Sequence, residues 1–440
     1  MRLRMSAVIE RVQGSLFFVP MAWVVFSIAL AQGTLAADAA IGRGPQKLPL
    51  GLGSTVESAR AVLGTVASAT MTVAGVAFSI SLLIIQLASS QYSPRIVHGL
   101  FRDRFNKRVM GLVVGTFTYC LVVLRAVRSP LDQSGTAVVP NISVAVAVIL
   151  GIATVLGVVA FINHSAHSMN VSELLDGVVA ETVSQMARTW SDRGDAPAAA
   201  TVAVVGESGG FTVRSDGRGW VKQVDGDALL ACLPPGATVR VDITPGRYAI
   251  RGAPLCTAWP APDDPASFTA RARRSFDLGR TRTMQQDVSY GLRQVVDVAL
   301  KALSPGVNDP TTAQEAIFHA SAIVAEGIRR EPPPRHRVDG EGRHLILPGA
   351  EDRAALIRLA FDEVREAAAP LPAVCRYLLE AIHLLKIGAV DAGDDACASL
   401  LDSQARLVLA GARHGGTLPE DLHLVEAAYR ERFGEPPTLT

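Results

Sequence analysis

The most distinctive segment of the chain runs from Ser304 to Thr312 and reads Ser-Pro-Gly-Val-Asn-Asp-Pro-Thr-Thr. Gly306 can end one helix, Asp309 can cap the next helix, and Pro310 suits the first turn of that helix. The free N–H groups at the start of the second helix could instead hold an anion. The segment is therefore either a connection between two helices or a ligand-binding turn, and its candidate residues are Ser304, Pro305, Gly306, Asn308, Asp309 and Pro310.

Five arginines lie close together a little earlier in the sequence: Arg271, Arg273, Arg274, Arg280 and Arg282. This spacing predicts a basic surface that is either solvated or attracted to anionic lipid headgroups. A bound phosphate or nucleotide is the alternative. Because the sequence has neither a Walker loop nor a GxGxxG motif, nothing indicates a nucleotide fold.

The sequence predicts no catalytic residue, no metal site and no cofactor. It has no G-x-S-x-G, no H-E-x-x-H and no kinase motif set. His164 and His167 lie three residues apart, but a third and fourth metal ligand are missing. The five cysteines are scattered, which predicts reduced thiols rather than a disulfide framework: Cys120, Cys232, Cys256, Cys375 and Cys397. We therefore do not expect an enzyme.

Four apolar stretches in the first part of the chain are long enough to cross a membrane, which takes about 20 residues. We place the spans at residues 15–37, 61–88, 109–127 and 142–162 of a transmembrane domain that covers residues 1–165. Arg2 and Arg4 before the first span, and Ala37-Asp38-Ala39 at its end, also resemble a signal peptide. Because the apolar run is long for a signal peptide, we favour a retained first span.

The distribution of basic residues predicts the orientation in the membrane. The N-terminal tail and the segment 89–108 together carry more arginine and lysine than the two segments on the other side. By the positive-inside rule both termini lie in the cytoplasm of a bacterium, and the protein is a multi-pass protein of the inner membrane. The net charge of +1 gives no general attraction for nucleic acid.

The spans are rich in small residues. Gly111 and Gly115 form a GxxxG pair, which favours close packing of helices. Small and hydroxyl side chains also recur along the second span, at Ser68, Thr70, Thr72, Gly75 and Ser79. They predict either packing within one molecule or a polar path. At the end of this span, the candidate pore or gate residues are Gln86, Ser89, Ser90 and Gln91.

The rest of the chain predicts a soluble part with three regions. Residues 166–198 are expected to form a connecting helix and a linker, and residues 199–260 a small all-β module. β-Prone runs in the module include Gly219–Val224, Ala228–Cys232 and Thr238–Ile243, and its glycine turns resemble a biotinyl/lipoyl-like barrel-sandwich. Lys222 lies inside a strand run and not at a hairpin tip, so a swinging arm is not expected. Residues 265–435 are expected to be helical, with a loop at Glu331–Gly349.

Several blocks of the sequence resemble one family, the predicted bacterial membrane proteins known as domain of unknown function 2254. The resemblance starts at Gln86-Leu87-Ala88-Ser89-Ser90-Gln91-Tyr92-Ser93-Pro94-Arg95 and continues through Gly115-Thr116-Phe117 and the Gly219–Leu255 segment. It is densest from Arg282-Thr283 to Thr312-Ala313. One departure is Asn163 before His164, where family members often pair two histidines. The resemblance implies an integral membrane protein and no established activity.

The fold class predicted is an α-helical membrane protein: four transmembrane helices, then a small β-barrel-sandwich-like module and a helical cytosolic domain. The leading functional hypothesis is a homo-oligomeric channel or transport assembly in the lipid bilayer, regulated by the cytosolic domain. The rival hypothesis is a membrane-anchored scaffold or sensor that binds an anionic ligand or lipid through Arg271–Arg282 and Ser304–Pro310. The sequence names neither the solute nor the ligand.

Overall fold

A computed structural model describes most of the chain. The described residues are 18–41, 55–91, 104–128, 139–167, 170–193, 209–347, 349, 352–416 and 418–435. They form two compact units, Met1–Asn170 and Val171–Thr440. The basic N-terminal tail, most of the basic segment 89–108 and most of the expected linker 191–200 lie outside the described residues.

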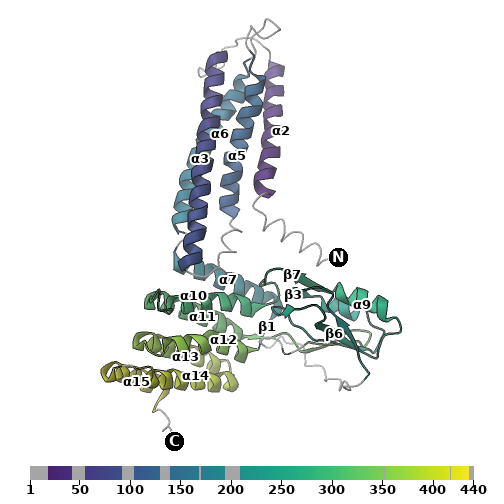
Figure 1. Ribbon diagram of the computed structural model, residues 1–440, viewed down its shortest axis with the longest axis vertical. Helices are drawn as coiled ribbons and strands as arrows, with labels where there is room; N and C mark the ends of the chain where they lie inside the picture. The colour runs from purple at the N-terminus through teal and green to yellow at the C-terminus, as the bar shows by residue number, and fades with distance from the viewer. Residues whose placement is uncertain are drawn as a thin grey trace. The chain divides into compact units, whose positions relative to one another are not determined.

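The first unit contains four long helices, drawn in Figure 1: α2 (Phe18–Ile41), α3 (Val56–Gln91), α5 (Arg104–Ala126) and α6 (Asn141–His167). Among the described residues, these four helices are long and apolar enough to cross a membrane. Large apolar side chains such as Phe26, Phe78 and Ile149 face outwards and are exposed, as expected for helices in lipid. The prediction of four apolar helices followed by sheet and helix is confirmed.

The GxxxG pair in α5 packs against α2. A Cβ atom at Gly111 would lie 2.3 Å from Cδ1 of Trp23, and one at Gly115 would lie 2.7 Å from Oγ of Ser27. Both distances are shorter than any real contact, so the two helices approach each other only because these positions are glycine. The pair therefore serves packing within one molecule.

A second link joins α2 to the start of α6. The carboxylate of Asp38 accepts hydrogen bonds from the backbone N–H groups of Ile142 (2.9 Å) and Ser143 (3.0 Å), and from the Ser143 hydroxyl (2.7 Å). A residue of one helix thus caps another. The Tyr119 hydroxyl of α5 lies 2.9 Å from that of Thr34 and donates to the Ser143 carbonyl.

The helices of the second unit form stacked hairpins beside the strands (Figure 1). They are α7 (Val171–Thr189), α10 (Val288–Ala302), α11 (Pro310–Arg329), α12 (Arg353–Ala368), α13 (Pro372–Asp391), α14 (Asp395–His414) and α15 (Pro419–Phe433). α10, α12 and α14 pack in one row, α11, α13 and α15 pack in a second row, and α7 packs on α10 and α11. Asp287, Asp309, Asp352 and Asp394 each accept a hydrogen bond from the first turn of the helix that follows, and so fix where α10, α11, α12 and α14 begin.

The described strands form three sheets. A five-stranded sheet has the order β2 (Phe211–Arg214), β6 (Pro254–Trp259), β4 (Thr238–Val241), β10 (His344–Ile346), β9 (His336–Val338). A three-stranded sheet has the order β5 (Tyr248–Ala249), β3 (Gly219–Val224), β7 (Phe276–Gly279). β1 (Ser191–Asp192) pairs with β8 (Arg330–Glu331). Only β4 and β10 run parallel among these strands. Two helices, α8 (Gly226–Leu230) and α9 (Pro265–Arg273), accompany the larger sheets, whose core includes Val221, Val239, Leu255 and Phe268.

Two sequence predictions about this region are wrong. Part of the expected loop Glu331–Gly349 forms β9 and β10, and β10 brings Leu345 into the core of the module. Strands of three residues are too short for a recognisable alternation, so the pattern did not reveal them. The β-prone run Ala228–Cys232 overlaps α8, because Asp225 caps this helix through the N–H of Ala228. The sheets therefore use residues on both sides of the boundary expected near residue 260.

Candidate anion-binding cavity

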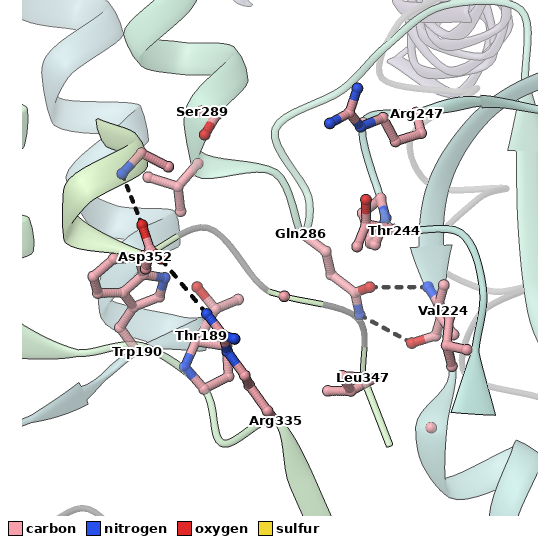
Figure 2. A pocket seen from close by; sticks show the side chains of 18 of the residues that line it. Thr189, Trp190, Val224, Thr244, Arg247, Gln286, Ser289, Arg335, Leu347 and Asp352 are labelled. Carbon is pink, nitrogen blue, oxygen red and sulfur yellow. Dashed lines mark hydrogen bonds and ion pairs between the residues drawn. The ribbon is translucent and has the colours of Figure 1, made fainter. Parts of the chain in front are cut away.

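A cavity of about 750 Å³ lies inside the second unit, between the strands and the ends of several helices. Its walls come from the end of α7, the ends of β3 and β4, the turn after β4, the starts of α10 and α12, and the segment around β9 and β10. In Figure 2, Val224, Thr244 and Arg247 lie on the strand side, Thr189 and Trp190 lie on the helix side, and Gln286 lies between them.

Arginine dominates the charged lining. Among the described residues, the lining contains one carboxylate, that of Asp352, and six arginines: Arg188, Arg247, Arg282, Arg335, Arg337 and Arg358. Three of the arginines have ion-pair partners. Arg282 pairs with Asp287 at 2.6 Å, Arg335 with Asp352 at 3.5 Å, and Arg337 with Asp227 at 2.7 Å.

The other three arginines form what we call the arginine trio: Arg188, Arg247 and Arg358. Their side chains are exposed, and no acidic side chain pairs with them within the described part of the chain. They come from the end of α7, the turn after β4 and the second turn of α12. The cavity therefore carries an excess of positive charge, which attracts anions.

Arg282 is held rigidly at the cavity wall. Its Nε lies 2.6 Å from Oδ2 of Asp287 and its Nη2 lies 3.0 Å from Oδ1. Its guanidinium also lies over the rings of Trp220 (5.9 Å) and Tyr290 (5.1 Å). The Asp287 side chain is 1% exposed and also caps α10. This bidentate pair fixes the start of α10 against the strands.

The turn that carries Arg247 rests on this ion pair. Gly246 has a φ of +80°, and a Cβ atom there would lie 2.2 Å from Oδ2 of Asp287. The Gly246 N–H donates to the Val221 carbonyl, and the Val221 N–H donates to the Arg247 carbonyl. Glycine is therefore required twice, for its backbone conformation and for its lack of a side chain.

Gln286 joins the loop before α10 to the end of β3. Its Oε1 accepts from the N–H of Val224 (2.9 Å) and its Nε2 donates to the Val224 carbonyl (3.3 Å), as the dashed lines in Figure 2 show. The side-chain amide thus replaces a neighbouring strand at this position. The cavity wall is anchored to both the sheet and the helices.

The remaining lining is mostly apolar. Trp190, Val241, Val288 and Leu345 are buried in the wall, and Leu347 is half-buried. α10 and α12 both begin at the cavity, where the positive ends of their dipoles add to the field of the arginines. The site can therefore hold an anionic group and an apolar group at the same time.

Of the five arginines that are clustered in the sequence, Arg282 lines the cavity. Arg271 donates to the Cys232 carbonyl, and Arg273 donates to the Arg214 carbonyl and to Asp216. Arg274 and Arg280 are exposed. The end of α9 and the strand β7 lie between these residues and direct the side chains to different places.

The segment from Ser304 to Pro310 connects α10 and α11 and does not line the cavity. Asp309 accepts from the N–H groups of Thr311 and Thr312 (both 3.1 Å) and from the Thr312 hydroxyl (2.6 Å). The Thr312 hydrogen bonds hold the pKa of Asp309 below its ordinary value. Asn308 has a left-handed φ of 48°. The segment therefore connects two helices, which is one of the two roles that the sequence suggested.

The candidate gate residues lie at the end of α3. Gln86 is exposed, and the side chains of Ser89, Ser90 and Gln91 lie outside the described residues. Further along the same helix, Ser68, Thr72, Gly75 and Ser79 are exposed on a side that the other helices leave open. The hydroxyls of Thr72 and Ser79 donate to carbonyls of α3 itself.

Sequence reasoning missed Arg188, Arg247 and Arg358 because they are far apart in the chain and no local pattern joins them. Pro245 and Gly246 are residues typical of a turn, but their position over Asp287 depends on contacts between distant segments. Burial raises the pKa of Cys256 to about 12 and that of Cys375 to about 11, which keeps both as thiols. The described residues contain no group of three or more acidic, histidine or cysteine side chains placed to hold a metal.

Four apolar helices followed by a unit of sheets and stacked helices place the chain among predicted membrane proteins. It belongs to the family described as "Predicted membrane protein (DUF2254)", whose match covers residues 13–383. The uncharacterized proteins Rv1290c of Mycobacterium tuberculosis and Mb1321c of Mycobacterium bovis are each 29% identical to it over 401 residues, which is 88% of this chain and 75% of theirs. No solved structure matches the chain.

Proposed function

We propose that this protein is a membrane-anchored sensor whose soluble unit binds an anionic ligand in the arginine-lined cavity. The observation that carries the proposal is the arginine trio, three guanidinium groups that line one cavity without an acidic partner among the described residues. Like charges around one cavity repel each other, and a bound anion relieves that repulsion. The site differs from the two that the sequence suggested and shares only Arg282 with them.

Chain connectivity supports a role in signalling. α6 ends at His167 and α7 begins at Val171, so only residues 168–170 separate the last apolar helix from α7. The other end of α7 supplies Arg188, Thr189 and Trp190 to the cavity. A ligand that draws Arg188 inwards therefore acts on the helix that leads directly to the membrane unit.

The test is anion binding to the full-length protein in detergent, measured by calorimetry with pyrophosphate. We expect binding that weakens as salt is added, since exposed charges are screened. The affinity of the variant R188A/R247A/R358A for pyrophosphate should be lower by more than about 100-fold. The matched control is R251A/R274A/R280A, which removes the same charge from exposed arginines outside the cavity. Equal binding by both variants would refute the proposal.

A second candidate function is the homo-oligomeric conduit, supported by the uncovered side of α3. Ser68, Thr72, Gly75 and Ser79 give this side small side chains that permit close approach of a second copy. We expect G75L to lower the mass of the protein in mild detergent, measured by light scattering, and to abolish ion flux in liposomes. A monomeric wild-type protein without flux would exclude the conduit and leave the sensor.

We also propose a bacterial inner-membrane location with both termini in the cytoplasm and a retained first span. Cleavage near Ala37–Ala39 would remove most of α2, including Trp23 and Ser27, which pack against α5. It would also cut the chain beside Asp38, which caps α6. The lipoyl-like form of the β-module remains a prediction, and Lys222 in β3 gives it no carrier lysine at a hairpin tip. Accessibility of tags at each terminus in intact spheroplasts tests the orientation, and the mass of the purified chain tests cleavage.

A further inference from the structure

We infer that the ligand of the cavity is a phosphate ester with two or three negative charges and an organic body that fills the rest of the site. This inference rests on the proposed anion-binding function and specifies its ligand. It depends on three properties of the cavity: its charge, its size and its apolar wall.

The charge of the cavity matches a phosphate ester or a diphosphate. The paired arginines Arg282, Arg335 and Arg337 are each balanced by one carboxylate, which leaves the positive charges of the trio. A single carboxylate would neutralise one of them. Phosphate and diphosphate groups carry two or three charges at neutral pH and accept the paired N–H bonds that a guanidinium donates.

The size of the cavity requires more than an inorganic ion. Its volume of about 750 Å³ lies in the range of cavities that bind organic molecules, about 300–1,000 Å³. One water molecule takes about 30 Å³ of liquid volume, and an inorganic phosphate is only a few times larger. An inorganic ion would leave most of the cavity to water, and so would use little of the wall.

The apolar wall indicates what the organic body contacts. Val241, Val288, Leu345 and Trp190 line the cavity but are each 4% exposed or less. The apolar surface that a ligand can cover therefore comes from the partly buried Leu347, Pro245 and Pro333 and the exposed Ala355. Leu347 is half-buried, so its free surface is available to a ligand. Burial of an apolar body against this surface adds affinity that an inorganic anion cannot gain.

A phosphate ester of this kind has two sources, a soluble nucleotide or a lipid phosphate from the membrane. ADP and pyrophosphate form a matched pair, because both carry a diphosphate and only ADP carries an organic body. Phosphatidylcholine vesicles that contain phosphatidic acid offer the lipid source. These probes can be applied to the full-length protein in detergent or in nanodiscs.

The experiment measures the affinities of wild type, R188A/R247A/R358A and L347Q for the three probes. We expect ADP or phosphatidic acid vesicles to bind at least about tenfold more tightly than pyrophosphate, as a well-placed apolar contact allows. The trio variant should lose its affinity for every probe, whereas L347Q should weaken only the binding of the organic probe. Its unchanged affinity for pyrophosphate serves as the control for folding.

Each outcome decides one claim. Tighter binding of ADP identifies a soluble ligand, and tighter binding of the vesicles identifies a lipid. Pyrophosphate binding that equals that of both organic probes, or that falls with them in L347Q, overturns the inferred ligand class but leaves the anion-binding function standing. A wild-type protein that binds none of the three probes overturns both.

Discussion

Two groups of arginines in the second unit have the same chemistry and opposite surroundings. Arg193 and Arg353 belong to what we call the arginine clamp, together with Glu331 and Asp394. Arg193 lies 2.8 Å from Asp394, and Arg353 lies 2.6 Å from Glu331 and 3.1 Å from Asp394. The trio of Arg188, Arg247 and Arg358 lines a cavity without such acids in the described chain.

The difference between the groups shows how arginines that hold a fold together can be told from arginines ready for a ligand. In the clamp, the remaining N–H groups also find carbonyls: Arg193 donates to Ala392, and Arg353 donates to Gly327 and Arg330. The clamp ties the segment after α7 to the starts of α12 and α14. A fully satisfied guanidinium stabilises the structure, whereas an unsatisfied one in a cavity has donors left for binding.

The largest expected effect is the loss of the clamp carboxylate. Asp394→Ala removes an N-cap, through Cys397 N–H at 3.0 Å, and the shared partner of two arginines. We expect a destabilisation of about 3 kcal/mol, because a cap contributes about 1 kcal/mol and the two partly buried arginines lose their counter-charge. The thermal unfolding midpoint of the full-length protein measures this change. The exposed neighbour Asp395→Ala is the control, and an equal shift in both variants would contradict the role of the clamp.

The second-largest expected effect concerns the ion pair between Arg282 and Asp287 at the cavity wall. Gly246→Ala places a Cβ atom on Asp287 in a left-handed turn, so the Arg282–Asp287 pair must shift. We expect a destabilisation of about 2 kcal/mol from backbone strain and the disturbed ion pair. Gly236→Ala has a similar φ of +74° but open space around the new Cβ, and should cost about 1 kcal/mol from backbone strain alone. If both variants shift the unfolding midpoint equally, the contact with Asp287 does not contribute to the destabilisation.

The pH dependence of stability separates the clamp from the trio, since only the clamp contains a titrating acid. Burial tends to raise the pKa of Asp394, but hydrogen bonds from Cys397 and the charges of Arg353 and Arg193 outweigh it and lower this pKa below 3.8. Because the folded-state pKa is lowered, the stabilisation is fully present above about pH 4 and disappears as the pH falls through the folded pKa. The difference in unfolding midpoint between wild type and Asp394→Asn should therefore shrink from pH 7 to pH 3. A difference that stays constant would exclude this linkage.

The sequence predicts elements well where a pattern is long and local. Four apolar runs gave α2, α3, α5 and α6, and the Asp309-Pro310 signal marked the start of α11. Strand β3 lies where the β-prone run Gly219–Val224 placed it. These features depend on hydrophobicity and capping within a few residues, which a single sequence displays.

The cavity could not be predicted because it is assembled from distant segments. Arg188 and Arg358 are 170 positions apart and line one site only because α7 ends and α12 begins at the cavity. In contrast, the cluster Arg271–Arg282 is dense in sequence, yet Arg282 lines the cavity while Arg271 and Arg273 have partners elsewhere. Proximity in sequence predicts proximity in a fold only within one element, and here α9 ends and β7 begins between the clustered arginines.

The smallest expected effect gives the sharpest contrast between the two groups. R188A/R247A/R358A should change the free energy of unfolding by no more than about 0.5 kcal/mol per site, because exposed side chains without a structural partner contribute little. Relief of mutual repulsion should move the change towards stabilisation, most visibly at low salt where screening is weak. The unfolding midpoint of this variant, compared with that of R193A/R353A, measures the contrast at equal buffer and detergent. A clear destabilisation of the trio variant would mean that these arginines support the fold in the way the clamp does. A stabilised variant that no longer binds pyrophosphate would show that the three charges destabilise the free protein and serve to bind a ligand.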